Sequence, residues 1–133
     1  MIDCENEVYT RVAKALREKF PGINISSEYV PTPSSFPHVS LVQVDNYAIG
    51  ELQDTSGQEN MGMSMMESNV HSNKTDGKKT ECKNIVKVIS DVMYSMNFRR
   101  TASTPVPNLE DATIYRIVSR FRAATDGKQF YRR

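Results

Sequence analysis

A chain of 133 residues has room for one domain with its own hydrophobic core, so we expect a single domain over residues 1–133 that needs no disulfide or metal to fold. Its 17 Lys and Arg residues nearly balance its 16 Asp and Glu residues, and the formal net charge of +1 argues against a general nucleic-acid-binding protein. No apolar run approaches the roughly 20 residues of a membrane-spanning helix, so no membrane partner is expected.

The N-terminal stretch MIDCENE is acidic and polar, unlike a secretory signal peptide. The 2 cysteines, Cys4 and Cys82, are far apart in the chain and make no disulfide framework. These features favour a reduced, cytosolic protein.

The first predicted element is a helix over residues 4–19. Val8, Val12 and Leu16 recur at helical spacing and form one apolar stripe. The Pro-Gly pair at residues 21–22 then ends the helix, because proline disfavours helix in the residue before it and glycine accepts a left-handed cap.

Two strands follow, over residues 23–29 and 38–47, and a proline-rich loop separates them. The second strand alternates imperfectly, because apolar side chains fall on both of its faces: Val39 and Leu41 on one, Val42 and Val44 on the other. Such a strand contains a bulge or is covered on both sides.

Residues 48–59 have little periodicity and are predicted to form a long loop, and a third strand follows over residues 60–73. Met61, Met63 and Met65 fall on one face of this strand, whereas Met66 falls on the other. Two interpretations stay open: the methionines fill a core, or they provide an adaptable surface for a partner.

The clearest helix spans residues 78–96, where apolar residues recur at helical spacing. A strand at residues 98–104 and a loop with two prolines lead to residues 112–124. This last stretch also fits a helical stripe, but we prefer a strand because β-branched and aromatic residues cluster there. Residues 126–133 are predicted to form a turn into a short last strand or a loose end.

The predicted element order is α-β-β-β-α-β-β. Because no β-α-β unit repeats at regular spacing, a doubly wound parallel sheet is not expected. We predict an α+β fold in which two helices pack on one face of an antiparallel, at most mixed, sheet.

A search for catalytic chemistry finds little. His38 and His71 lie on different predicted strands, and neither has a Cys, His or carboxylate at metal-ligand spacing. Glu110 and Asp111 are adjacent, but neighbours on an extended chain point apart. A cysteine-histidine dyad is left open, although helix packing fits both cysteines better. We therefore expect no enzymatic activity, no metal and no cofactor.

Arginines stand out near the C-terminus. On a strand, Arg116, Arg120 and Arg122 share one face, while the other face carries Tyr115, Ile117, Phe121 and Ala123. Across a hairpin, Arg99 and Arg100 could join them in one basic patch. Three interpretations compete: phosphate binding, a subunit interface and a solvated face. The near-neutral net charge of the chain makes phosphate binding the least favoured of the three. The candidate interface residues are Arg99, Arg100, Arg116, Arg120, Arg122, Met61, Met63 and Met65.

The chain resembles the tail terminator, or tail completion, proteins of long-tailed bacteriophages. The element order matches over the whole chain, and the C-terminal third carries the residue patterns: Tyr94-Ser-Met96-Asn-Phe98-Arg99, Pro105-Val-Pro107-Asn108-Leu-Glu-Asp111-Ala112, Tyr115-Arg116, Arg120-Phe121 and Phe130-Tyr131-Arg132-Arg133.

This resemblance implies a structural virion protein of the tail and neck, assembled in the host cytoplasm. Such proteins form a hexameric ring that caps the head-proximal end of the tail tube, stops tube polymerisation and offers a surface for the head. The implied partners are other copies of the chain, the major tail tube protein and the head connector or stopper protein, with DNA only as passing cargo. The arginine face is expected at subunit contacts or turned from the channel, since a basic lining would hold DNA.

Two alternatives remain from the sequence. A head-closure or head–tail adaptor protein is also a small ring-former of the neck. A small nucleic-acid-binding α+β module belongs to a different class and would place exposed aromatics among the basic residues. The expected strand register counts against it, because it puts Tyr115 and Phe121 on the face opposite Arg116 and Arg120.

Overall fold

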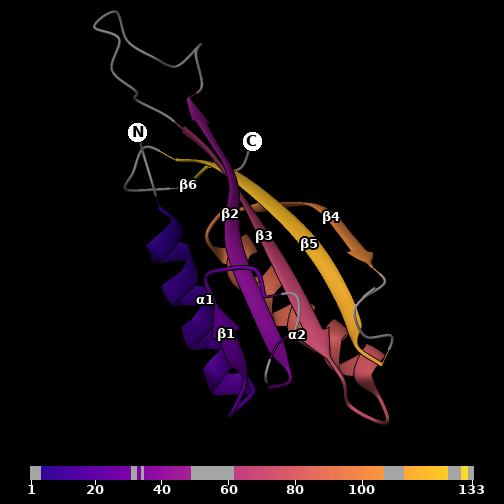
Figure 1. Ribbon diagram of the computed structural model, residues 1–133. Helices are drawn as coiled ribbons and strands as arrows, with labels where there is room; N and C mark the ends of the chain where they lie inside the picture. Colours follow the sequence, from indigo (N-terminus) through magenta and orange to yellow (C-terminus); the bar gives the residue numbers. More distant parts are fainter. Residues whose placement is uncertain are drawn as a thin grey trace, which may run out of the picture.

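Two helices cover one face of a six-stranded sheet (Figure 1). The computed structural model describes residues 4–30, 33, 35–48, 62–106, 113–125 and 130–131, with backbone alone for 46–48. The elements are α1 (Glu5–Lys19), β1 (Asn24–Ser26), β2 (His38–Ala48), β3 (Gly62–Ser72), α2 (Lys78–Ser95), β4 (Arg99–Pro105), β5 (Tyr115–Thr125) and β6 (Phe130–Tyr131). The predicted α+β class and element order are confirmed.

The sheet runs in the order β1-β2-β3-β5-β4, and the short β6 also pairs with β5. Its centre is the long antiparallel pair of β3 and β5, which stay in register from Gly62 opposite Thr125 to Ser72 opposite Tyr115. Only β1 runs parallel to its neighbour among the described strands. The sheet is therefore antiparallel with one parallel edge pair.

The core lies between the helices and the sheet. On α1, Val8, Val12 and Leu16 are fully buried, as their spacing predicts. The remaining fully buried large apolar side chains come from α2 and the strands, among them Val39, Leu41, Met66, Ile85, Ile89, Met93 and Phe121. Phe98 and Phe130 close one end, with ring centroids 5.1 Å apart. This layer uses one stripe of each helix and one face of the sheet, which leaves the opposite sheet face for other contacts.

The last long strand is confirmed as a strand rather than a helix. For the strand that starts at His38, the sequence leaves two alternatives open, a bulge or cover on both sides, and a bulge is present. The pairing of β2 with β3 shifts register between Gln43 and Asp45, and the intervening Val44 is exposed. The bulge accounts for Val44, whereas Val42 precedes it and lies opposite Glu67 on the sheet face that points away from the core.

The first strand is much shorter than the predicted 23–29. The Ser26 hydroxyl accepts a hydrogen bond from the Glu28 amide at 3.1 Å, so the chain turns after three residues. The turn formed by the Ser26 side chain thus ends the strand, although the alternation of apolar and polar residues continues to residue 29. Met61 and the Glu110-Asp111 pair lie outside the described residues.

We expect Leu16→Ala to lower the free energy of unfolding by about 2–5 kcal/mol, because it opens a cavity where α1 packs on the rest of the core. Lys14→Ala, an exposed position on the same helix, is the control and should change stability by less than about 0.5 kcal/mol. Chemical denaturation measures both. Equal effects would mean that α1 does not pack as described.

Candidate functional site

The sheet face that points away from the helices is the candidate site, and we call it the outer face. Paired residues of an antiparallel ladder point to the same side, so the register fixes its members. They are His38, Ser40, Val42 and Asp45 of β2, Met63, Met65, Glu67, Asn69 and His71 of β3, Arg116, Val118, Arg120 and Arg122 of β5, and Arg99, Ala102 and Thr104 of β4. No helix among the described residues covers this face (Figure 1).

A continuous chain of polar contacts crosses the outer face between β3 and β5. Arg116 donates through both Nε and Nη2 to Oδ1 of Asn69, at 2.9 and 2.7 Å. Asn69 in turn donates through Nδ2 to Oε1 of Glu67 at 3.1 Å. The other Glu67 oxygen accepts from Nε of Arg120 at 2.9 Å. Two of the candidate arginines are therefore held in fixed positions by this Arg-Asn-Glu-Arg chain.

Arg122 is placed differently from its neighbours. It pairs in register with Met65 on one side and Arg99 on the other. Its Nε atom is buried and has no hydrogen-bond partner among the described residues. A buried cationic donor without an acceptor is costly, so this position favours a carboxylate or carbonyl acceptor that is not among the described residues.

Two buried histidines lie at one end of the outer face. His38 and His71 are register partners on β2 and β3, with ring centroids 6.2 Å apart. Tyr29 covers them, 6.3 Å from His71, and the Arg116 guanidinium lies 5.1 Å from the Tyr29 ring centre. His71 is fully buried, and neither ring nitrogen has a hydrogen-bond partner among the described residues. Burial first, then the charges of Arg116 and His38, lowers the pKa of His71 to about 4.

The opposite end of the outer face carries the methionines. Met63 is buried and Met65 is half-buried, and both point away from Met66, which lies in the core. The sequence-based assignment of these three residues to two faces is confirmed. The structure brings Met65 beside Arg122, so apolar and cationic candidates meet on one surface.

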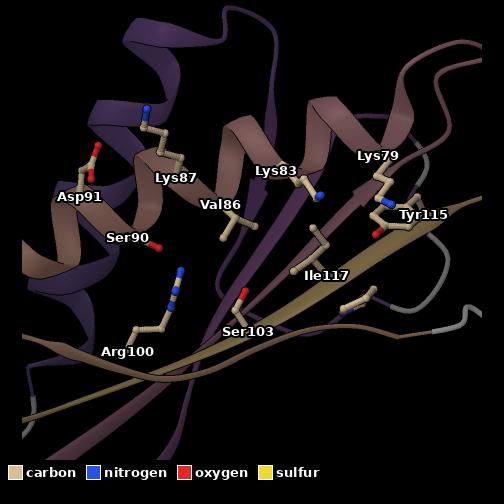
Figure 2. Close-up of a pocket in the computed structure, with 11 residues that line it drawn as sticks. Lys79, Lys83, Val86, Lys87, Ser90, Asp91, Arg100, Ser103, Tyr115 and Ile117 are labelled. Atoms are coloured by element: carbon tan, nitrogen blue, oxygen red, sulfur yellow. The ribbon is translucent and has the colours of Figure 1, made fainter.

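Arg100 does not belong to this surface, although the sequence placed it with the other arginines. It lies opposite Phe121 in the ladder and points to the helix side, where it lines a groove of about 550 Å³ between α2 and β4 (Figure 2). Lys79, Lys83 and Lys87 line the same groove from α2. Sequence reasoning missed this cluster; the signal was three lysines at i, i+4 and i+8, which face one side of a helix.

Neither cysteine forms a catalytic pair with a histidine in this structure. Cys82 is buried on the helix side of the sheet, where its thiol lies 3.5 Å from the Tyr115 carbonyl oxygen, whereas both histidines lie on the outer face. Burial, and then the charge of Glu81, raises the pKa of Cys82 to about 12. No three potential metal-ligating side chains come together within the described ranges. In the same ranges, no helix is long and apolar enough to cross a bilayer.

No protein-family model matches the chain, and a search of curated proteins gives no significant match. The function is therefore argued from the surfaces described above.

Stability should fall as the pH is lowered from about 6.5 to about 4. The folded-state pKa of His71 lies below its ordinary value, so the unfolded chain binds the proton first and gains stability from it in this window. The contribution is about 1.4 kcal/mol per pH unit at most. His71→Phe should reduce this slope and change stability little at pH 8. Denaturant titrations of both proteins at pH 8 and at several values between pH 6.5 and pH 4 test this. Equal dependence of the free energy of unfolding on pH in the two proteins would contradict it.

Asn69→Leu should lower the free energy of unfolding by about 1–3 kcal/mol, because Arg116 loses the acceptor for two of its N–H groups. Thr104→Ala, at an exposed position of the same face, is the control and should have little effect. Thermal or urea unfolding measures the difference. A neutral Asn69→Leu would mean that the polar chain across β3 and β5 does not stabilise the sheet.

Proposed function

We propose that the protein is a structural virion subunit of the tail-terminator type. Copies of it close into a ring on the head-proximal end of the tail tube, stop tube polymerisation and present a surface to the head connector or stopper protein. The proposal has no catalytic step and no cofactor. The observation that carries it is the chemistry of the outer face.

The outer face has the composition of a protein interface rather than of a solvated sheet surface. Interfaces are enriched in Met and Arg and depleted in Lys. The strands of this sheet contain arginine but no lysine, while all the lysines lie elsewhere in the chain. Met63, Met65, Val42 and Val118 lie among the arginines of this face. The mixture supports a contact with another protein.

The unpartnered Arg122 Nε adds a specific requirement. Arg116 and Arg120 already have acceptors within the chain, whereas Arg122 has none among the described residues. A neighbouring subunit that brings an acceptor to Arg122 would satisfy it. A ring built in this way needs a heterologous contact, in which two different surfaces of the same chain meet.

The free edge of the sheet favours contact through faces rather than strand-to-strand growth. All seven residues of β4 are exposed. The strand carries Arg99, Arg100 and Pro105, and its pairing with β5 shifts register next to Thr101. Charge, proline and bulges are the devices that keep sheet edges from pairing with each other. Continuous fibre-like addition at β4 is thus disfavoured, which suits a ring of limited size.

A ring-forming head-closure or adaptor protein of the neck is the nearest alternative, since the same surfaces support it. Binding to purified tail tubes, as opposed to connector-capped heads, separates the two roles. A nucleic-acid-binding role has less support, because Arg116 and Arg120 are engaged by Asn69 and Glu67 rather than free for phosphate.

Light scattering after size exclusion, with negative-stain microscopy of any large species, tests the proposal. We expect wild-type protein, alone or with tail tubes, to form closed rings of about six subunits. Arg120→Glu and Val42→Glu, both on the outer face, should reduce the ring fraction at least tenfold.

Lys14→Glu on α1 is the control, because it changes an exposed charge on the helix side. Circular dichroism shows whether each variant is folded. The proposal is contradicted if wild-type protein stays monomeric and does not bind tail tubes. It is also contradicted if folded outer-face variants assemble normally.

A further inference from the structure

The groove between α2 and β4 collects positive charge that no other described side chain neutralises through an ion pair. Lys79 and Lys83 reach it from α2, and Arg100 reaches it from β4 (Figure 2). Lys87 and Asp91 also line it. Within the described part of the chain, none of these cations forms an ion pair. Four cations and one carboxylate therefore surround a space of about 550 Å³.

The groove also has apolar and hydrogen-bonding groups, which a simple anion would not contact. Val86, Ile117 and Pro105 give it apolar walls. The Ser90 hydroxyl is buried and has no partner among the described residues, and Figure 2 shows it directed toward Arg100. Lysines one helical turn apart are separated by about 6 Å along the axis, close to the spacing of every second residue in an extended peptide. A ligand that fits this lining offers carboxylates to the cations, apolar side chains to the walls and backbone amides to the Ser90 hydroxyl. An acidic polypeptide segment has all three.

The chain itself contains a segment of this chemistry. Residues 20–73 include no lysine or arginine, and their carboxylates are Glu28, Asp45, Glu51, Asp54, Glu59 and Glu67. Within it, residues 45–59 combine Asp45, Glu51, Asp54 and Glu59 with the apolar Tyr47, Ile49 and Leu52. The near-neutral total charge thus hides a strong separation between an acidic part and a basic part of the sequence.

A neighbouring copy is better placed than the same copy to fill the groove. Strand β2 ends at Ala48, and β3 resumes at Gly62 opposite Thr125, at one end of β5. The near end of the groove is at Arg100, which pairs with Phe121. The far end, where Lys79 lies beside Tyr115, is roughly 30 Å from Thr125 for a strand of this length (Figure 2). Asp45 lies on the outer face, so the sheet itself stands between it and the groove of its own copy. Acidic and basic surfaces on different ends of one chain fit a head-to-tail contact.

We infer that the α2–β4 groove receives the acidic segment 45–59 of a second copy of this chain. This inference rests on the proposed self-assembly and deepens it by naming the two surfaces that meet. The lysines and Arg100 pair with carboxylates of the neighbour, and the apolar walls contact its apolar side chains.

A synthetic, fluorescently labelled peptide of residues 45–59 tests the groove directly. Its binding is measured by anisotropy at low and high salt, with protein diluted below any assembly. We expect saturable binding that weakens with salt, and at least tenfold weaker binding to Lys79→Glu/Lys83→Glu. Lys14→Glu/Arg17→Glu on α1 carries the same charge change away from the groove and is the matched control.

Equal binding of the peptide to the groove variant and to the control variant would overturn the inference, as would no binding at all. A single-stranded oligonucleotide of the same length that binds the groove more tightly than the peptide would overturn it as well, and would favour nucleic acid as the occupant.

Charge exchange within the ring gives the second test. Lys79→Glu/Lys83→Glu and Glu51→Lys/Asp54→Lys should each abolish ring formation, and a chain that carries all four changes should recover it. Rings that form normally from the first variant would refute the groove contact while leaving the proposed function intact. Groove-dependent peptide binding by a wild-type chain that never assembles would place the segment in the groove of its own copy, and would overturn both the contact between copies and the proposed function.

Discussion

The pairing of β3 with β5 is the constraint on which the rest of the structure depends. It is continuous over the full length of both strands. It places Met66, Val70, Ile117 and Phe121 under the helices and turns Asn69, Glu67, Arg116 and Arg120 outward. Side chains alternate with a period of two, so a slip of one residue would exchange the two sets. Both the core and the outer face therefore exist only in this register, and the polar chain from Arg116 to Arg120 helps to specify it.

Much of this architecture could be predicted, because the governing signals are local. The stripe of Val8, Val12 and Leu16 defines α1, and the β-branched and aromatic run after Ile114 defines β5 over its helical alternative. Other features depend on contacts that periodicity does not contain. The short β1 follows from a Ser26 side-chain turn. Adjacent residues of a strand point apart, so Arg99 and Arg100 had to separate, but only the pairing with Arg122 and Phe121 decides which one faces outward. The groove needed the packing of α2 beside β4, which no local pattern encodes.

The distribution of the two basic residue types links sequence to surface. Arginine occupies the strands, where its planar group can accept fixed partners such as Asn69 and Glu67. Lysine occupies α2, where its flexible, strongly hydrated ammonium groups gather at a groove. A composition close to neutrality suggests an electrostatically uniform protein, yet the strands carry arginine but no lysine, and α2 carries lysine but no arginine. Complementary charge of this kind favours one relative orientation wherever two charged surfaces meet.

The hydrogen bonds of the outer-face arginines affect the entropy that these side chains lose when the face binds another molecule. A long side chain that becomes ordered only on binding loses about 0.5–1.5 kcal/mol of rotational freedom. Asn69 already holds Arg116 through two hydrogen bonds in the folded chain, so for Arg116 this loss occurs during folding and not during association. Arg120 is half exposed and has one ion pair, with Glu67, so it is held less firmly. The face is therefore partly preorganised, and a partner that bound it would meet side chains that are already ordered. Complexes formed by such surfaces need little rearrangement, and their lifetimes are set by the contacts made rather than by the refolding of either side.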